Sequence, residues 1–144
     1  NLVAVARGVD DRAAVRRAMG LLEFLEIDTI AEKWGSELSY GQRKLVEMLV
    51  QVNRAGLLAL HLGRLKDRGE ITPAQVSFGK LDNVRQALDV AREARSLLGA
   101  NGITLEYPVI RHMNNLESVY TYEGTNEIHT LVLGQAITGT PAFT

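Results

Sequence analysis

Apolar residues recur at three- and four-residue steps along most of the chain, which is the spacing that places them on one face of an α-helix. The first such stripe consists of Val15, Ala18, Leu22 and Leu25. It follows Asp10 and Asp11, two acids that suit the cap and first turn of a helix. The pattern predicts a helix over about residues 10–27. A short helical turn between Asp28 and Trp34 is expected next, before the periodicity breaks at Trp34-Gly35-Ser36.

Two longer helices are each predicted to begin at a capping box, in which a hydroxyl and an amide three residues later satisfy backbone donors reciprocally. Ser39 and Gln42 open one helix that runs to about Asp67. Thr72 and Gln75, with Pro73 in the first turn, open another that runs to about Leu98. The apolar stripes are Leu45, Leu49, Val52, Ala59, Leu62 and Leu65, and then Val76, Leu81, Val84, Leu88, Ala91, Ala94 and Leu98. Because the connecting loop is short, these two helices are expected to pack antiparallel.

Two further helices are expected near the end of the chain. Pro108 suits the first turn of a helix over about 107–114, and another apolar segment covers 131–137. No alternation of apolar and polar residues is long enough to predict a strand. The predicted fold class is therefore all-α, a bundle of about four to five helices.

Composition excludes several classes of function. The 144 residues are 46% hydrophobic and 23% charged, with a net charge of −1, so no basic field attracts nucleic acid. There is no cysteine, which removes disulfides and thiolate metal sites and fits a cytoplasmic, bacterial-like location. No signal-peptide pattern and no uninterrupted apolar run of spanning length is found, so no membrane span is expected. The chain does not start with methionine, and we expect it to be a partial chain.

The candidate chemistry lies between the last two predicted helices. Glu123 stands between Tyr122 and Gly124, where an aromatic ring could partly desolvate the carboxylate and glycine would permit close approach of a ligand. Such a carboxylate can serve as a general base. The alternative is an ordinary turn with a solvated glutamate, and a single loop carboxylate does not decide between them.

No metal site is expected. His61, His112 and His129 fall on separate predicted helices, with neither cysteine nor a paired carboxylate at ligand spacing. We interpret them as surface or core histidines.

From about residue 48 onwards the chain resembles the C-terminal helical domain of acyl-CoA dehydrogenases, most closely that of the glutaryl-CoA dehydrogenases. Five segments carry the resemblance, and they occur in the family's order. They are His61-Leu62-Gly63-Arg64-Leu65-Lys66-Asp67, Leu98-Gly99-Ala100-Asn101-Gly102-Ile103, residues 107–113, Tyr122-Glu123-Gly124-Thr125, and Leu133-Gly134-Gln135-Ala136-Ile137-Thr138-Gly139.

The resemblance implies that Glu123 is the base that takes the α-proton of an acyl-CoA thioester while a hydride passes to FAD. It also implies that the Glu123 backbone N–H polarises the thioester carbonyl, and that Tyr122 and Gly124 contact the substrate. It assigns Thr125, Asn126 and Glu127 to FAD contacts, with Thr125 capping the last helix. Gly99 and Ala100 match a turn that approaches the FAD of a neighbouring subunit, which implies a homo-oligomer. Ala100 replaces a glycine of the family pattern.

Residues 1–47 instead resemble the helical subdomain of ABC-transporter ATPases of the amino-acid import type. The matching segments are Ala18-Met19-Gly20-Leu21-Leu22-Glu23-Phe24 and Leu38-Ser39-Tyr40-Gly41-Gln42-Arg43-Lys44. By this resemblance Ser39, Gly41 and Gln42 would contact a nucleotide γ-phosphate at a helix N-terminus. The alternative is that Ser39 and Gln42 only cap a helix.

Together these resemblances predict two segments, 1–47 and 48–144, that meet within one long helix at about Arg43 to Leu49. Neither Walker motif is found, so ATP hydrolysis is not expected. The dehydrogenase domains that hold most of the FAD and acyl-CoA are also missing, as is an Arg-x-Gln-Phe-Gly motif. We expect a partial acyl-CoA dehydrogenase without activity on its own. The alternatives are a helical interaction module, a nucleotide-sensing fragment and a fusion product without evolved function.

Overall fold

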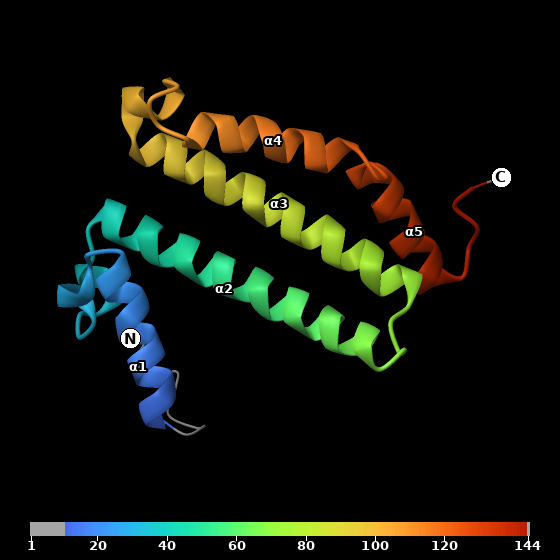
Figure 1. Cartoon of the computed structure of the whole chain (residues 1–144), viewed down its shortest axis with the longest axis horizontal. Coiled ribbons are helices and arrows are strands. Elements are labelled where there is room, and N and C mark those ends of the chain that lie inside the picture. The colour runs from blue at the N-terminus through green and yellow to red at the C-terminus, as the bar shows by residue number, and fades with distance from the viewer. Residues whose placement is uncertain (1–10, 144) are drawn as a thin grey trace. The chain divides into compact units, whose positions relative to one another are not determined.

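A computed structural model of the chain describes residues 11–143, and the regular secondary structure in this range is entirely helical. The α-helices are α1 (Asp11–Phe24), α2 (Tyr40–Asp67), α3 (Pro73–Leu97), α4 (Val109–Thr121) and α5 (Asn126–Thr138) (Figure 1). Short 3-10 turns connect them at η2 (Asp28–Ile30), η3 (Gly35–Glu37) and η4 (Gly99–Ile103). The all-α prediction is confirmed. Asp10, where the first helix was expected to begin, lies outside the described residues.

The chain divides into two compact units, one ending at Leu49 and one beginning at Val50, so α2 contributes to both. The core of the first unit consists of Leu22, Ile27, Ile30 and Ala31. Leu22 is only 1% exposed. The helix α1 ends before the predicted residue 27 because Glu26 adopts a left-handed φ of 56°. The Ile27 N–H then donates to the Leu22 carbonyl at 2.9 Å, which closes the helix end.

Both predicted capping boxes are present. The Ser39 N–H donates to Gln42 Oε1 at 3.0 Å and the Gln42 N–H donates to Ser39 Oγ at 3.2 Å. The Thr72 N–H donates to Gln75 Oε1 at 2.8 Å and the Gln75 N–H donates to Thr72 Oγ1 at 3.3 Å. The starts of α2 and α3 are therefore fixed by residues within one helical turn, as the sequence predicts.

In the second unit α3 is the central element, and both α4 and α5 pack along it (Figure 1). Leu88, at 2% exposure, and Ala91 form its buried centre. The other neighbour is α2: the Arg54 Nε donates to Gln86 Oε1 at 3.0 Å, and a Cβ at Gly79 would overlap Leu62 Cδ1. Arg54 meets Gln86, and the later residue Leu62 meets the earlier residue Gly79, so the two helices are antiparallel, as expected.

By length and composition, α2 is the one helix of the described range that could cross a membrane. A single helix of this kind is weak support for a membrane span. It carries Glu47 and Arg54 within its apolar stretch, and charged side chains of this kind are costly in a hydrocarbon core.

Candidate functional site

The joint between α4 and α5, residues 122–125, has an unusual backbone. Tyr122 ends α4, and its N–H donates to the Ser118 carbonyl at 3.0 Å. Glu123 has a φ of 58° and Gly124 a φ of 89°. Glycine adopts such values freely, whereas a left-handed residue with a side chain costs about 1–2 kcal/mol. The joint therefore places a strained glutamate at the position that the sequence singles out.

Two cations from α3 bind the joint around Glu123, Lys80 through backbone carbonyls and Arg85 through the Asn126 side chain. Lys80 Nζ donates to the Tyr122 carbonyl at 2.5 Å and also to the Gly124 carbonyl. It lies 6.0 Å from the centre of the Tyr122 ring. One turn and a half further along α3, the Arg85 Nε donates to Asn126 Oδ1 at 2.8 Å. The joint is thus fixed to α3 on both sides of the carboxylate.

Gly124 is required by space as well as by its backbone angle. A Cβ at this position would lie 3.0 Å from His129 Nε2 and 3.2 Å from His129 Cε1. Both ring nitrogens of His129 are shielded from solvent and have no hydrogen-bond partner within the described part of the chain. In the same range, no group of three His, Cys, Asp or Glu residues could hold a metal ion.

The carboxylate of Glu123 is open to solvent, and the Tyr122 side chain is 54% exposed. The partial desolvation expected from the neighbouring ring is therefore not seen within this chain. What the chain supplies is the backbone geometry of the carboxylate.

The first turn of α5 places three of the predicted residues together. Thr125 caps the helix as expected, since its Oγ1 accepts the Ile128 N–H at 3.4 Å. Asn126 is 6% exposed, with its Oδ1 occupied by Arg85. A hydrogen bond from its own backbone N–H, and a further one from the Thr125 hydroxyl, lower the pKa of Glu127 below its ordinary range, and the charge of Arg85 acts in the same direction.

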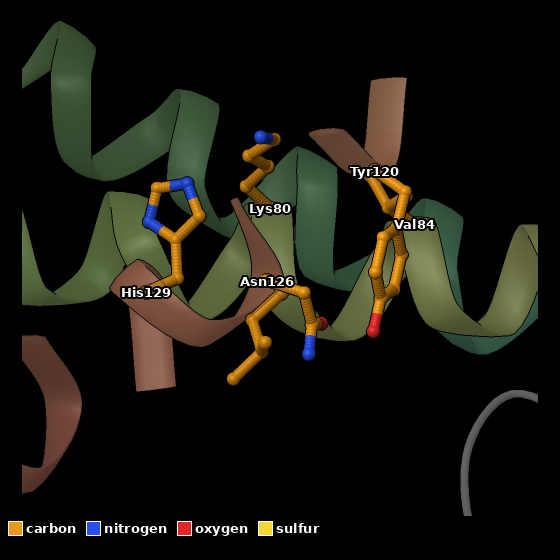
Figure 2. A pocket seen from close by; sticks show the side chains of 6 residues that line it. Lys80, Val84, Tyr120, Asn126 and His129 are labelled. Carbon is orange, nitrogen blue, oxygen red and sulfur yellow. The ribbon is translucent and has the colours of Figure 1, made fainter. Parts of the chain in front are cut away.

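A shallow hollow lies beside this joint. It is lined by Lys80, Leu81, Val84, Tyr120, Asn126 and His129 (Figure 2). Its space of about 140 Å³, open solvent included, is well below the several hundred Å³ typical of small-molecule pockets. The described residues alone therefore do not enclose a small molecule at this hollow.

Gly99 and Ala100 lie far from Glu123. They begin η4 at the C-terminal end of α3, whereas the joint lies over its first half (Figure 1). Lys80 and Leu97 are about 26 Å apart along the helix axis, at about 1.5 Å per residue. Gly99 has a φ of 58°, and the exposed Ala100 follows it. The structure therefore brings Tyr122 to Glu127 together and leaves the Gly99 turn separate.

Lys80 and Arg85 were not among the predicted site residues. Lys80 stands four residues before Val84, so it shares a helix face with an apolar residue of the predicted stripe. A lysine on such a face signals a partner for its charge. The identity of that partner, 42 and 44 residues away, is visible only in the folded chain.

Comparison with known proteins identifies the family to which this all-helical chain, with a strained glutamate between its last two helices, belongs. The model of the acyl-CoA dehydrogenase C-terminal domain matches residues 9–138, and the chain belongs to this family. It is 33% identical over 94 residues to a short-chain specific acyl-CoA dehydrogenase of Megasphaera elsdenii, which covers 65% of the chain and 24% of that protein. The human mitochondrial short-chain enzyme is 31% identical over 98 residues, which is 68% of the chain and 24% of that protein. The chain spans about a quarter of the length of these relatives.

Solved structures give a more particular similarity. The crystal structure of glutaryl-CoA dehydrogenase from Mycobacterium smegmatis matches with a TM-score of 0.72 and 52% identity, over 86% of this chain and 33% of that one. A second structure of a glutaryl-CoA dehydrogenase from the same organism, in complex with FADH2, matches with a TM-score of 0.72 and 48% identity, over 88% of this chain and 35% of that one.

These matches correct the interpretation of residues 1–47. The family model begins at residue 9 and continues through the predicted junction, so the resemblance to an ABC-transporter ATPase and the fusion of two histories are not supported. The local chemistry explains the motif otherwise: Ser39 and Gln42 form the capping box of α2, and Gly41 has no heavy atom near the position of a Cβ.

Proposed function

We propose that this chain supplies the C-terminal helical domain of an FAD-dependent acyl-CoA dehydrogenase that acts on glutaryl-CoA or a similar thioester, with Glu123 as the base. The observation that carries the proposal is the left-handed Glu123 whose two flanking carbonyls are bound by Lys80. Strained residues that the surrounding structure holds in place are characteristic of active sites. The similarity to two glutaryl-CoA dehydrogenase structures supports the substrate class.

In this proposal Glu123 accepts the α-proton of the thioester, and its backbone N–H donates to the thioester carbonyl, which acidifies the α-carbon. Tyr122 and Gly124 line the approach of the acyl chain. When bound, FAD supplies the acceptor for the hydride that leaves the β-carbon. Within the chain as described, the exposure of Glu123 means that the rest of the enzyme must exclude water from the base.

The first turn of α5 fits part of a flavin nucleotide. The Glu127 carboxylate lies at the helix N-terminus, where its negative charge is stabilised and would repel a diphosphate. An ionised carboxylate and a threonine hydroxyl instead accept hydrogen bonds from hydroxyl or amino groups. Thr125, Asn126 and Glu127 would therefore hold the hydroxyl- or amine-bearing parts of FAD, with Asn126 kept in place by Arg85.

The Gly99–Ala100 turn is proposed to meet the FAD of a second subunit in a homo-oligomer. Its separation from Glu123 along α3 supports this assignment, because one small cofactor region cannot contact both. The Ala100 side chain is exposed, so its methyl group points to a surface that a partner could cover.

The absence of cysteine from the sequence supports a cytoplasmic location for the enzyme.

A domain exchange tests the function. The matching region of the Mycobacterium smegmatis glutaryl-CoA dehydrogenase, which is 52% identical, is replaced by this chain, and FAD content and thioester-dependent loss of flavin absorbance are measured. We expect FAD to be retained and glutaryl-CoA to reduce it. Glu123→Gln should keep FAD and slow reduction by a factor of about 10²–10⁴, the usual contribution of a general base.

Two results would refute the proposal. One is a folded, FAD-loaded exchange protein that no acyl-CoA reduces, and the other is a Glu123→Gln variant that reacts as fast as the parent. Glu117→Gln is the matched control, because Glu117 is an exposed glutamate of α4 that pairs with Arg92 on the surface. Butyryl-CoA in place of glutaryl-CoA tests the substrate class separately.

A further inference from the structure

We propose that Lys80 is a positioning residue for the base: its ammonium group fixes the left-handed backbone of Glu123 and directs the Glu123 N–H towards the substrate carbonyl. The inference rests on the proposed function in assigning Glu123 as the base. The geometric part concerns this chain alone and can be tested without catalysis.

The two hydrogen bonds of Lys80 bracket the strained residue. They bind the carbonyl of the peptide that enters Glu123 and the carbonyl of the peptide that leaves Gly124, so the two-residue segment Glu123–Gly124 is held at both ends. The Lys80 side chain is half-buried on α3. Charge-assisted hydrogen bonds are the stronger kind in proteins, and two from one lysine restrict the backbone angles of Glu123 and Gly124 jointly.

Because the peptide group is planar, the restraint on the Tyr122 carbonyl also sets the direction of the Glu123 N–H. The described residues contain no cis peptide bond, and in a trans peptide the C=O and N–H point to opposite sides. With the Tyr122 carbonyl directed at Lys80, the Glu123 N–H is directed away from it. Within the described residues, no hydrogen bond is donated by that N–H. It is therefore a backbone donor that is oriented and available.

The positive charge of Lys80 also polarises the Glu123 N–H. A cation bound at the carbonyl polarises the amide, and polarised hydrogen bonds strengthen one another in series. The peptide between Tyr122 and Glu123 thus transmits the positive charge of Lys80 to the N–H, where negative charge develops on the thioester oxygen. Within the described range no carboxylate forms an ion pair with Lys80, so no direct ion pair neutralises its charge.

The geometric part is tested by NMR on the 144-residue chain. A positive φ gives a strong intraresidue amide–Hα NOE, and we expect it at Glu123 in the parent, in Lys80→Arg and in the control Lys66→Met, which changes an exposed lysine of α2. Lys80→Met should lose it. Lys80→Gln is the second variant, because its short amide cannot reach both carbonyls but keeps a polar group in the half-buried position. An undiminished NOE in Lys80→Met or Lys80→Gln would overturn the proposal.

The catalytic part is tested in the exchanged glutaryl-CoA dehydrogenase. Lys80→Met should lower kcat by a factor of about 10–100, the scale of a misplaced or weakened transition-state donor, with KM little changed. Lys80→Arg should recover most of the loss, because guanidinium also donates to two acceptors. Equal kcat in Lys80→Met and parent, or a loss confined to KM, would overturn the role of Lys80. An inactive parent with the expected NOE pattern would instead refute the proposed function and leave the geometric part standing.

Discussion

Replacing a left-handed glutamate with glycine should stabilise this protein, and the chain offers two such positions. Glu26 and Glu123 have φ values of 56° and 58°. Left-handed backbone costs a residue with a side chain about 1–2 kcal/mol. Glycine avoids that cost but loses about 0.5–1 kcal/mol of additional backbone entropy on folding. Both carboxylates are exposed, so little else is lost. The expected net gain is about 0.5–1 kcal/mol for Glu26→Gly and for Glu123→Gly.

Urea denaturation measures this gain as a shift of the midpoint at constant slope, and thermal unfolding should shift upwards by about 2–8 °C. Glu26→Ala and Glu123→Ala are the matched controls, because alanine removes the carboxylate but keeps the strain. They should leave the free energy of unfolding nearly unchanged. If the alanine variants gained as much as the glycine variants, or if Glu123→Gly were less stable than the parent, the strain argument would be wrong.

Further predictions concern the core, a turn, a cap and pH. Leu88→Ala should lower the free energy of unfolding by about 2–5 kcal/mol through loss of burial and the cavity left behind, measured in urea. Gly102→Ala should lower the free energy of unfolding by about 1–3 kcal/mol, because its Cβ would overlap the backbone of Arg95 in α3. Gly63→Ala, with open space at the Cβ position, should not lower it. Thr125→Ala should cost about 1 kcal/mol as the cap of α5 is lost. The pKa of Glu127 is lowered by hydrogen bonds from its own backbone N–H and from the Thr125 hydroxyl. Its ionisation should therefore stabilise the fold above the unfolded-state pKa, and this contribution should disappear as pH falls through the folded-state pKa. Glu127→Gln should remove that pH dependence, which NMR titration and urea midpoints from pH 6 downwards would measure.

Local signals in the sequence are sufficient for the starts of α2 and α3. The capping residues Ser39, Thr72 and Thr125 act on backbone groups within three residues, and each occupies the predicted place. Helix lengths depend on more distant contacts. The α4 helix extends to Thr121, past the predicted residue 114, and α5 begins at Asn126, ahead of the predicted residue 131. Both extensions contact α3, since Arg92 binds Glu117 and Arg85 binds Asn126, and periodicity within one segment does not reveal such interactions.

The candidate site was predictable in part. Tyr122 to Glu127 follow from the motif, and the structure brings them together at one joint. The left-handed backbone of Glu123 was not predicted, since glutamate carries no preference for it. The contribution of Lys80 depends on tertiary structure. Positive φ alone does not identify a site, because Glu26 shares it; the two hydrogen bonds from α3 distinguish Glu123.

The separation of Lys80 from its acceptors has a consequence for the order of folding. Its hydrogen bonds close loops of 42 and 44 residues, and contacts of such sequence separation form only after the loop-closure entropy has been overcome. The helices α4 and α5 can begin to form locally, but the geometry of the joint between them has to await docking on α3. A peptide that contains only the Tyr122-Glu123-Gly124-Thr125 motif would therefore lack the conformation that the motif has here. The left-handed conformation of Glu123 is therefore expected to form late in folding.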